Sequence, residues 1–226
     1  KDLGEAIHAY PNNTVKLFDG LRLGVKVQRG PTLDGLGKYP RKVIGESDEE
    51  VVDVPEVLRE SEADILINYV PVGSTKAAQA YARAAMEAGV GFINAMPVFI
   101  ASDPAWAAEF EKRGLPVAGD DIMSQIGATV VHKTLVKLMA DRGVKVDETY
   151  QLNVGGDMDF MNMLEEERLK DKRESKTSAV RAMTKYPVPT RIGPSDYIPF
   201  LENQKICYVW AKGRYFAGTP VTIELK

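Results

Sequence analysis

One segment of the chain, Gln151–Lys176, concentrates the side chains best suited to chemistry. Four side chains in its first half carry amide or carboxylate oxygens: Asn153, Asp157, Asp159 and Asn162. In its second half, Lys172 and Lys176 are four residues apart and would share one face of a helix. The oxygens can bind hydroxyl groups or a cation, and the ammonium groups can bind phosphate or a developing oxyanion. The pattern suits a phosphorylated polyhydroxyl ligand, although an ordinary turn before a solvated charged helix would look the same.

A second pair of carboxylates, Asp120 and Asp121, follows Gly119 at the end of an apolar run. Adjacent carboxylates at the end of a strand could hold a hydrated cation or a sugar hydroxyl. One of them could equally cap the helix that is expected to follow. The sequence leaves both interpretations open.

The elements that must position these side chains alternate between strand and helix. Strands are predicted at 63–70, 89–94 and 115–119, and helices at 75–88, 103–112 and 124–141. This alternation is typical of an α/β fold with a parallel sheet. Ligands of such sheets bind at the carboxyl ends of the strands, which are followed here by the turns 69–74, 94–97 and 119–124. Free backbone N–H groups in these turns could hold phosphate oxygens, although tight strand–helix connections explain the same residues.

The pattern changes after Val144, where a domain boundary is predicted. One strand is expected at 148–154, and two more are expected at 206–211 and 219–226. The last strand alternates apolar and polar residues, which indicates a sheet with one solvated or interface face. Lys205, just before these two strands, could be a solvated charge at the edge of the sheet.

The bulk composition argues against several classes of protein. The 226 residues have a net charge of -3 and a pI near 5.6, which offers no electrostatic basis for binding nucleic acid or an anionic membrane. No apolar run approaches the roughly 20 residues that span a bilayer. The single cysteine, Cys207, excludes an internal disulfide and fits a packing role in a reducing cytoplasm.

Several blocks of residues resemble the inositol-3-phosphate synthase family, also called myo-inositol-1-phosphate synthases. Three blocks look like the signature sequences of that family: Gly119–Thr129, Leu152–Leu164 and Lys172–Thr177. Three more look like its bacterial and archaeal branch: Gln28–Lys38, Phe92–Asp103 and Ile192–Asp196. Because these blocks follow in the right order, the similarity covers essentially the whole chain.

The resemblance implies an NAD-dependent isomerase that converts D-glucose 6-phosphate into 1D-myo-inositol 3-phosphate. Carbon 5 would be oxidised by hydride transfer, the ring would close by enolisation and an intramolecular aldol step, and the same hydride would reduce the product. The family joins an NAD(P)-binding Rossmann-type domain to an α+β catalytic and tetramerisation domain. Residues 1–144 would then form a partial Rossmann domain and 145–226 an incomplete catalytic domain of a cytoplasmic homotetramer.

The resemblance also implies roles for individual residues. The catalytic positions would be Lys172, Lys176 and Lys205. The substrate-binding positions would be Asn153, Asp157, Asp159, Asn162 and Ser175. The cofactor-binding positions would be Tyr69, Pro71, Gly73, Ser74, Asn94, Pro97, Gly119, Asp120, Asp121 and Ser124, with Asp121 also near a bound divalent or monovalent cation.

Three residues depart from the pattern of the family, which usually has Lys at Met123, Asn at Asp157 and Asp at Asn203. The glycine-rich pyrophosphate loop of the family has no match in this chain, and its position would precede Lys1. A further catalytic lysine and carboxylate would follow Lys226, so the chain is expected to be part of a longer polypeptide. A non-catalytic homologue that acts as a binding or assembly subunit is the alternative function.

Overall fold

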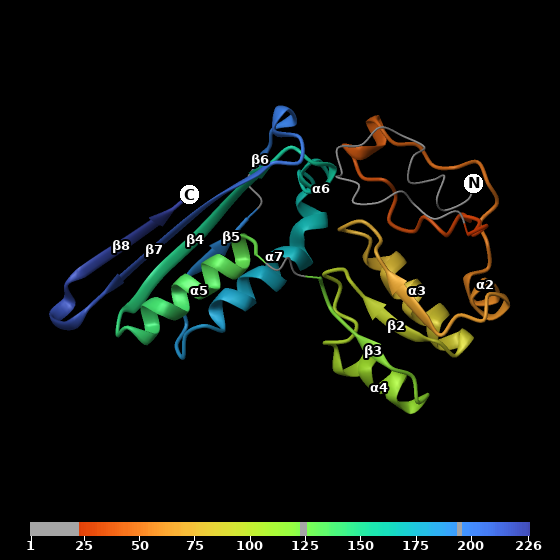
Figure 1. Cartoon of the computed structure of the whole chain (residues 1–226), viewed down its shortest axis with the longest axis horizontal. Helices are drawn as coiled ribbons and strands as arrows, with labels where there is room; N and C mark the ends of the chain where they lie inside the picture. Colours follow the sequence, from red (N-terminus) through yellow and green to blue (C-terminus); the bar gives the residue numbers. More distant parts are fainter. Residues whose placement is uncertain (1–22, 123–125, 194–195) are drawn as a thin grey trace.

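The computed structural model describes residues 23–122, 126–193 and 196–226, without the side chains of Asp171 and Lys172. These residues form two lobes that lie end to end (Figure 1). The first lobe contains a parallel sheet of three strands, and the second contains a mixed sheet of five strands. The predicted α/β class with a parallel sheet is confirmed.

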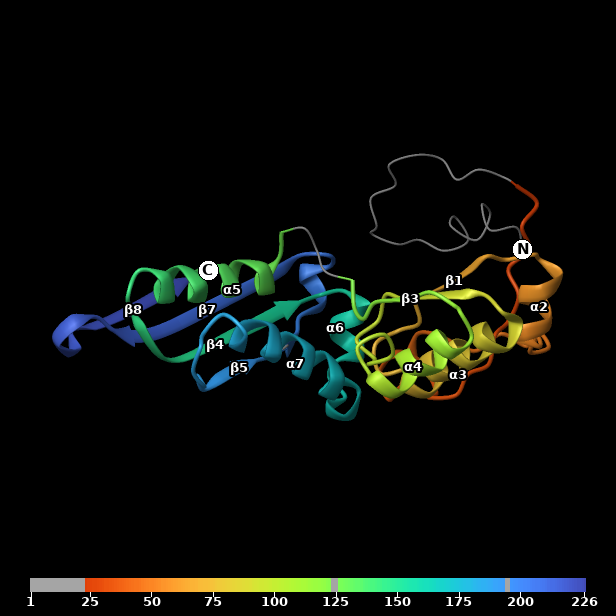
Figure 2. The ribbon, with the colours of Figure 1, turned by 90° about the horizontal axis from the view of Figure 1, so that it is seen from below.

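The first lobe is built from the predicted strand–helix units. Its strands, in spatial order, are β1 (Ile65–Asn68), β2 (Gly91–Asn94) and β3 (Val117–Ala118). Its helices are η1 (Pro40–Lys42), α2 (Val54–Glu60), α3 (Thr75–Ala88) and α4 (Pro104–Lys112). Figure 2 shows α3 and α4 on the same side of this sheet.

Small side chains hold α3 close to the sheet of the first lobe. Ala78, Ala82 and Ala85 are fully buried and recur at the spacing of one helix face. They belong to the same apolar cluster as Phe92 of β2 and Phe110 of α4. The sheet therefore has a well-packed side under α3 and α4, which holds the carboxyl ends of its strands in place.

The second lobe contains one long sheet with helices on one face (Figures 1 and 2). Its strands are β4 (Lys145–Gly155), β5 (Thr190–Ile192), β6 (Asp196–Tyr197), β7 (Lys205–Arg214) and β8 (Pro220–Leu225). Its helices are α5 (Ala128–Asp141), α6 (Met158–Asn162), α7 (Glu166–Arg181), η2 (Pro199–Leu201) and η3 (Phe216–Gly218). Within the described ranges, no helix combines the length and the apolar character needed to cross a lipid bilayer.

Helix α5 packs on the second sheet, although the sequence places it in a strand–helix unit of the first lobe. Its buried face carries His132, Val136 and Met139. Val136 and Met139 share an apolar cluster with Val146 of β4 and Val180 of α7. A division of the chain at residue 144 would separate α5 from the sheet that it covers. We therefore propose that the boundary between the two lobes precedes α5.

Candidate functional site

A cavity of about 980 Å³ lies between the two lobes and is lined by residues of both. Many of the residues singled out in the sequence line it: Tyr69, Pro71, Ser74, Pro97, Asp121, Asn153, Asp159, Asn162, Ser175, Lys176 and Lys205. Several others do not: Gly73, Asn94, Gly119, Asp120 and Asp157. Ser124 and the side chain of Lys172 lie outside the described residues, and the backbone of Lys172 belongs to α7. The fold thus brings the two halves of the predicted site to one cavity.

Strand pairing brings Lys205 to the cavity across some 50 residues of sequence. In the antiparallel pair of β4 and β7, Lys205 lies opposite Gly155 and Cys207 lies opposite Asn153. Cys207 therefore lines the cavity beside Asn153. Burial raises the pKa of its thiol, and the positive charge of Lys176 acts in the opposite direction. The sequence suggested only a packing role for Cys207, whereas the structure also places it at the cavity wall.

The ammonium group of Lys205 is held by a carboxylate and an aromatic ring. Its Nζ lies 3.2 Å from Oδ2 of Asp157 and 5.2 Å from the centre of the Phe160 ring. Asp157 also begins α6, because its Oδ1 accepts a hydrogen bond of 3.0 Å from the backbone N–H of Phe160. A Cβ at Gly155 would come within 2.8 Å of that ring, so glycine allows the ring its position. Asp157 thus pairs with Lys205 without lining the cavity itself, and its contact with a substrate stays a prediction.

Helix α7 contributes Ser175 and Lys176 to the lining of the same cavity. The Oγ of Ser175 lies 3.5 Å from Oδ2 of Asp121, at the limit of a hydrogen bond. Asp121 itself adopts a positive φ of 68°. In the described ranges, no group of three or more His, Cys, Asp or Glu side chains is arranged to hold a metal ion. Asp121 thus lines the cavity, and its contact with a cation stays a prediction.

In the first lobe, two carboxylates of the protein accept hydrogen bonds from backbone N–H groups that follow the predicted turns 69–74 and 94–97. Oδ1 and Oδ2 of Asp34 accept hydrogen bonds of 3.0 and 2.8 Å from the N–H groups of Lys76 and Ala77, at the start of α3. Ser74, which occupies the N-cap position of α3, makes no such side-chain bond. Asp34 therefore takes two N–H groups at the start of α3 that could have bound an external anion, and a contact of the turn 69–74 with phosphate stays a prediction.

Asp120 likewise accepts hydrogen bonds from backbone N–H groups, here in the segment between β2 and α4. Its two oxygens accept bonds of 2.8 to 3.1 Å from the N–H groups of residues 100–102, and one of 2.7 Å from Nδ2 of Asn94. Asn94 is buried and also accepts a bond of 2.8 Å from Nδ2 of Asn68. The sequence left open whether Asp120 binds a ligand or caps a helix. In the structure, Asp120 accepts hydrogen bonds from the loop at residues 100–102 and does not cap the helix that follows it.

Two of the predicted cofactor residues are glycines that allow close approach of other groups. Gly73 has a φ of 86°, and a Cβ there would lie 2.5 Å from the Cβ of Arg168. Gly119 has a φ of 138°, and a Cβ there would lie 2.4 Å from the backbone oxygen of Asn94. Both glycines therefore serve packing between segments, and a contact of either with a cofactor stays a prediction.

The site and fold can be compared with known proteins. The sequence model of a family described as Myo-inositol-1-phosphate synthase matches residues 127–226. The whole chain is 52% identical to the inositol-3-phosphate synthase of Mycolicibacterium smegmatis and 53% identical to that of Mycobacterium tuberculosis. The chain belongs to the inositol-3-phosphate synthase family. It spans 64% and 62% of the length of these two relatives.

A solved structure extends the family likeness to the fold. The crystal structure of Ari2 is 36% identical and superposes with a TM-score of 0.64. The match covers 96% of this chain and 57% of Ari2. The arrangement of the two lobes in this member of the inositol-3-phosphate synthase family is therefore shared with a known structure.

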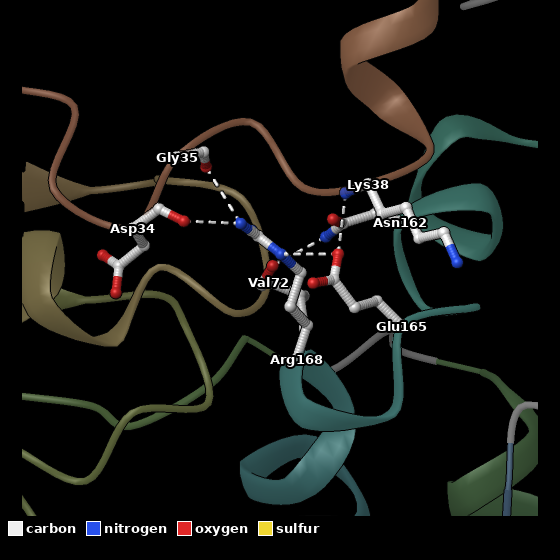
Figure 3. Close-up of polar contacts among 7 residues, drawn as sticks. All are labelled: Asp34, Gly35, Lys38, Val72, Asn162, Glu165 and Arg168. Carbon is white, nitrogen blue, oxygen red and sulfur yellow. Dashed lines mark hydrogen bonds and ion pairs between the residues drawn. The ribbon is translucent and has the colours of Figure 1, made fainter.

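Arg168 joins the two lobes of this inositol-3-phosphate synthase homologue and was missed in the sequence. Its side chain is 9% exposed, lines the cavity and donates from Nη2 to the backbone oxygens of Asp34 and Gly35, at 2.7 and 2.9 Å (Figure 3). Its Nε lies 3.3 Å from Oε2 of Glu165, which also accepts from the backbone N–H of Lys38 at 2.9 Å. No spacing in the sequence reveals contacts that span more than 130 residues.

Asn162 makes a second connection between the lobes. Its Nδ2 donates to the backbone oxygen of Val72 at 2.6 Å (Figure 3). Asn162 is buried and lines the cavity, and Val72 lies in the turn that follows β1. Asn162 therefore holds the loop after β1 against α6. One of its hydrogen-bond donors is used for this structural contact.

Proposed function

We propose that the complete protein is an inositol-3-phosphate synthase that converts D-glucose 6-phosphate into 1D-myo-inositol 3-phosphate without net redox change. The observation that carries the proposal is the cavity shared by the two lobes. It brings the ammonium groups of Lys176 and Lys205 into one space with the oxygens of Asn153, Asp159 and Asn162. This combination suits a ligand with both phosphate and hydroxyl groups.

The first-lobe part of the cavity is proposed to hold NAD. Tyr69, Pro71 and Ser74 after β1, and Pro97 after β2, would line it. When bound, NAD accepts a hydride and returns it later in the same cycle. These residues combine apolar surface with few polar groups, as cofactor pockets commonly do. The start of α3 is occupied by Asp34, so the NAD phosphates would bind elsewhere.

The second-lobe wall is proposed to bind and activate the sugar phosphate. Lys176 and Lys205 would stabilise the phosphate and the enolate or alkoxide charge that develops during ring closure. Asn153, Asp159 and Asn162 would orient the hydroxyl groups, with Ser175 at the same wall. Lys172 is proposed to move the proton next to the oxidised carbon, as the family resemblance implies.

A cation is proposed only with Asp121 as a possible ligand. The described residues supply that one carboxylate, with the Ser175 hydroxyl 3.5 Å from it. Divalent cations of the calcium and magnesium type take six or more oxygen ligands, and magnesium retains water for several of them. The proposed reaction therefore includes no step that depends on a cation.

The proposal is tested with the complete protein, glucose 6-phosphate and a catalytic amount of NAD. The expected result is inositol phosphate in excess over NAD, with no accumulation of NADH. Net NADH formation would instead indicate an ordinary dehydrogenase. Lys172→Ala is expected to abolish turnover while leaving the oligomer intact, and substantial residual activity would contradict the role given to Lys172.

A non-catalytic binding or assembly subunit is the second candidate. The ion pair between Asp157 and Lys205 favours it, because the carboxylate partly neutralises a lysine proposed for phosphate binding. Ligand binding without turnover in the complete protein would support this candidate. A homotetramer in the cytoplasm stays a prediction from the family resemblance, and sedimentation of the complete protein would test the tetramer.

A further inference from the structure

A row of buried polar side chains leads from the interior of the second lobe to the cavity. Thr149, Gln151 and Asn153 occupy alternate positions of β4 and therefore share the face covered by helices. His132 of α5 lies over this row and is completely buried. Asn153, at the end of the row, lines the cavity. The role proposed for the cavity does not use His132.

Short distances link each member of this row to the next. His132 Nε2 lies 2.7 Å from Oγ1 of Thr149, and its Nδ1 lies 3.2 Å from Oε1 of Gln151. Gln151 Nε2 donates to Oδ1 of Asn153 at 3.0 Å, and Asn153 Nδ2 donates to the backbone oxygen of Gly193 at 2.6 Å. The row is a continuous hydrogen-bonded chain from helix α5 to the cavity wall.

The chemistry of the end of the chain sets the direction of every bond. A backbone oxygen can only accept, so Nδ2 of Asn153 must point to Gly193 and its Oδ1 to Gln151. Gln151 then donates from Nε2 and presents Oε1 to His132. Since Oε1 also only accepts, Nδ1 of His132 must carry a hydrogen. This requirement holds whether or not Nε2 is protonated as well.

Burial keeps the imidazole in one state near neutral pH. Desolvation lowers the pKa of His132 to about 4, and the hydrogen bond to Gln151 acts in the opposite direction. The ring is therefore neutral at pH 7, with Nδ1 protonated and the lone pair of Nε2 facing Thr149. The Thr149 hydroxyl carries one hydrogen, and donating it to this lone pair at 2.7 Å is the alternative to donating it to the backbone oxygen of Trp210, also at 2.7 Å.

We propose that His132 is a positioning residue: through Gln151 it holds the Asn153 carboxamide in the place where it meets the sugar phosphate in the cavity. This role rests on the proposed function, since it takes a polyhydroxyl ligand to be the partner of Asn153. The Gly193 oxygen sets the orientation of Asn153, and Gln151, held by the Nδ1 hydrogen of His132, supplies the second bond. Without the Nδ1 hydrogen, Gln151 loses the donor to its Oε1, and the bond from its Nε2 to Asn153 weakens. The hydroxyl group of the substrate would then meet an amide that is held by one bond instead of two.

The test compares two substitutions at residue 132 in the complete protein. His132→Leu removes the Nδ1 donor, whereas His132→Asn places an amide N–H near the same point. We expect the KM for glucose 6-phosphate to rise about tenfold in His132→Leu and to stay within about twofold in His132→Asn, since one hydrogen bond contributes roughly that much. The affinity for NAD should be unchanged in both. Equal KM values in the two variants would overturn the proposal.

Thr149→Val is the matched control, because it breaks the chain on the far side of His132. It should lower stability, as His132→Leu does, but leave the KM for glucose 6-phosphate unchanged. If His132→Leu does not fold, Gln151→Leu interrupts the chain at the next bond and should raise the KM in the same way. A rise in KM for Thr149→Val as large as for Gln151→Leu would contradict positioning through His132.

The protonated nitrogen can be measured without any turnover. Nitrogen-15 NMR of the histidine rings, with the His132 signal identified by its loss in His132→Asn, should show the hydrogen on Nδ1. It should also show no titration between pH 8 and pH 5.5. A hydrogen on Nε2 alone would overturn the proposal even in an active enzyme. The Nδ1 result in a protein without turnover would disprove the proposed function and leave the bond directions standing.

Discussion

The two sides of the cavity use their polar groups in opposite ways. On the first lobe, Asp34 and Asp120 accept hydrogen bonds from backbone N–H groups at the start of α3 and in the loop before α4. On the second lobe, Lys176 and Lys205 line the cavity itself. The charged side chains named on the first lobe thus shape its turns, whereas the two lysines of the second lobe lie at the cavity, where a ligand is proposed to bind. Charged residues close to the same cavity therefore differ in role according to the backbone groups that lie within their reach.

The largest effect is expected from the second lobe. Lys176→Met should reduce kcat of the complete protein by about 10² to 10³ fold, because it removes a charge that stabilises a developing oxyanion. The midpoint of urea unfolding should change little. Lys170→Met, at an exposed position of the same helix, is the control and should retain activity. An equal loss in both variants would remove the distinction between the cavity wall and the solvated face.

Arg168→Met tests the connection between the lobes. The substitution leaves the backbone oxygens of Asp34 and Gly35 without their buried donor, and we expect a loss of about 3 kcal/mol in the free energy of unfolding. Urea denaturation measures it. Arg181→Met, at an exposed position near the end of α7, should cost much less. Similar costs would mean that the contacts of Arg168 add nothing to the stability of the protein.

Asp120→Ala tests whether the first-lobe carboxylates serve structure alone. It removes the acceptor of three backbone N–H groups and one side-chain amide, and should cost about 2 kcal/mol in stability. Thermal unfolding measures the loss. In Asp120→Asn, which retains one oxygen, the loss should be smaller. NAD affinity measured below the unfolding temperature should stay close to wild type, and a large loss of affinity in a folded variant would show that Asp120 also contacts the cofactor.

The buried histidine makes stability depend on pH. Its folded pKa of about 4 lies below the ordinary value of 6.5, so the unfolded chain binds the proton first as the pH falls. The stability present above pH 6.5 is therefore lost between pH 6.5 and 4, by about 1 kcal/mol at pH 5.5. Urea unfolding at pH 7 and 5.5 measures it. His132→Asn should lack this component, and an unchanged pH dependence would contradict the burial of a neutral ring.

Asp157→Asn should have the smallest effect on stability. Asparagine caps a helix as well as aspartate does, and the lost ion pair involves a lysine whose side chain is 54% exposed. The change in the free energy of unfolding should stay below about 1 kcal/mol. Release of Lys205 should tighten glucose 6-phosphate binding a few-fold at low ionic strength, with less gain in added salt. Isothermal titration at two salt concentrations measures both, and weaker binding would show that Asp157 itself holds the ligand.

Much of the fold could be predicted because it depends on local patterns. The alternating strands and helices of residues 63–118 appear where the sequence predicts them. The placement of α5 could not be predicted, because its apolar face at residues 132, 136 and 139 fits either sheet. Only the tertiary contacts decide between two partners of equal hydrophobicity.

The sequence by itself determined which residue types are available to the site and on which elements they lie. The spacing of Asn153 to Asn162 and of Lys172 to Lys176 is a local property, so it could be recognised without a structure. The tertiary structure decided which of these groups line the cavity and which form hydrogen bonds with the backbone. It also added Arg168 and His132, whose partners are distant in the chain or on another element. Hydrogen bonds saturate, so the function of a carboxylate or an amide depends on the donors that the fold brings to it.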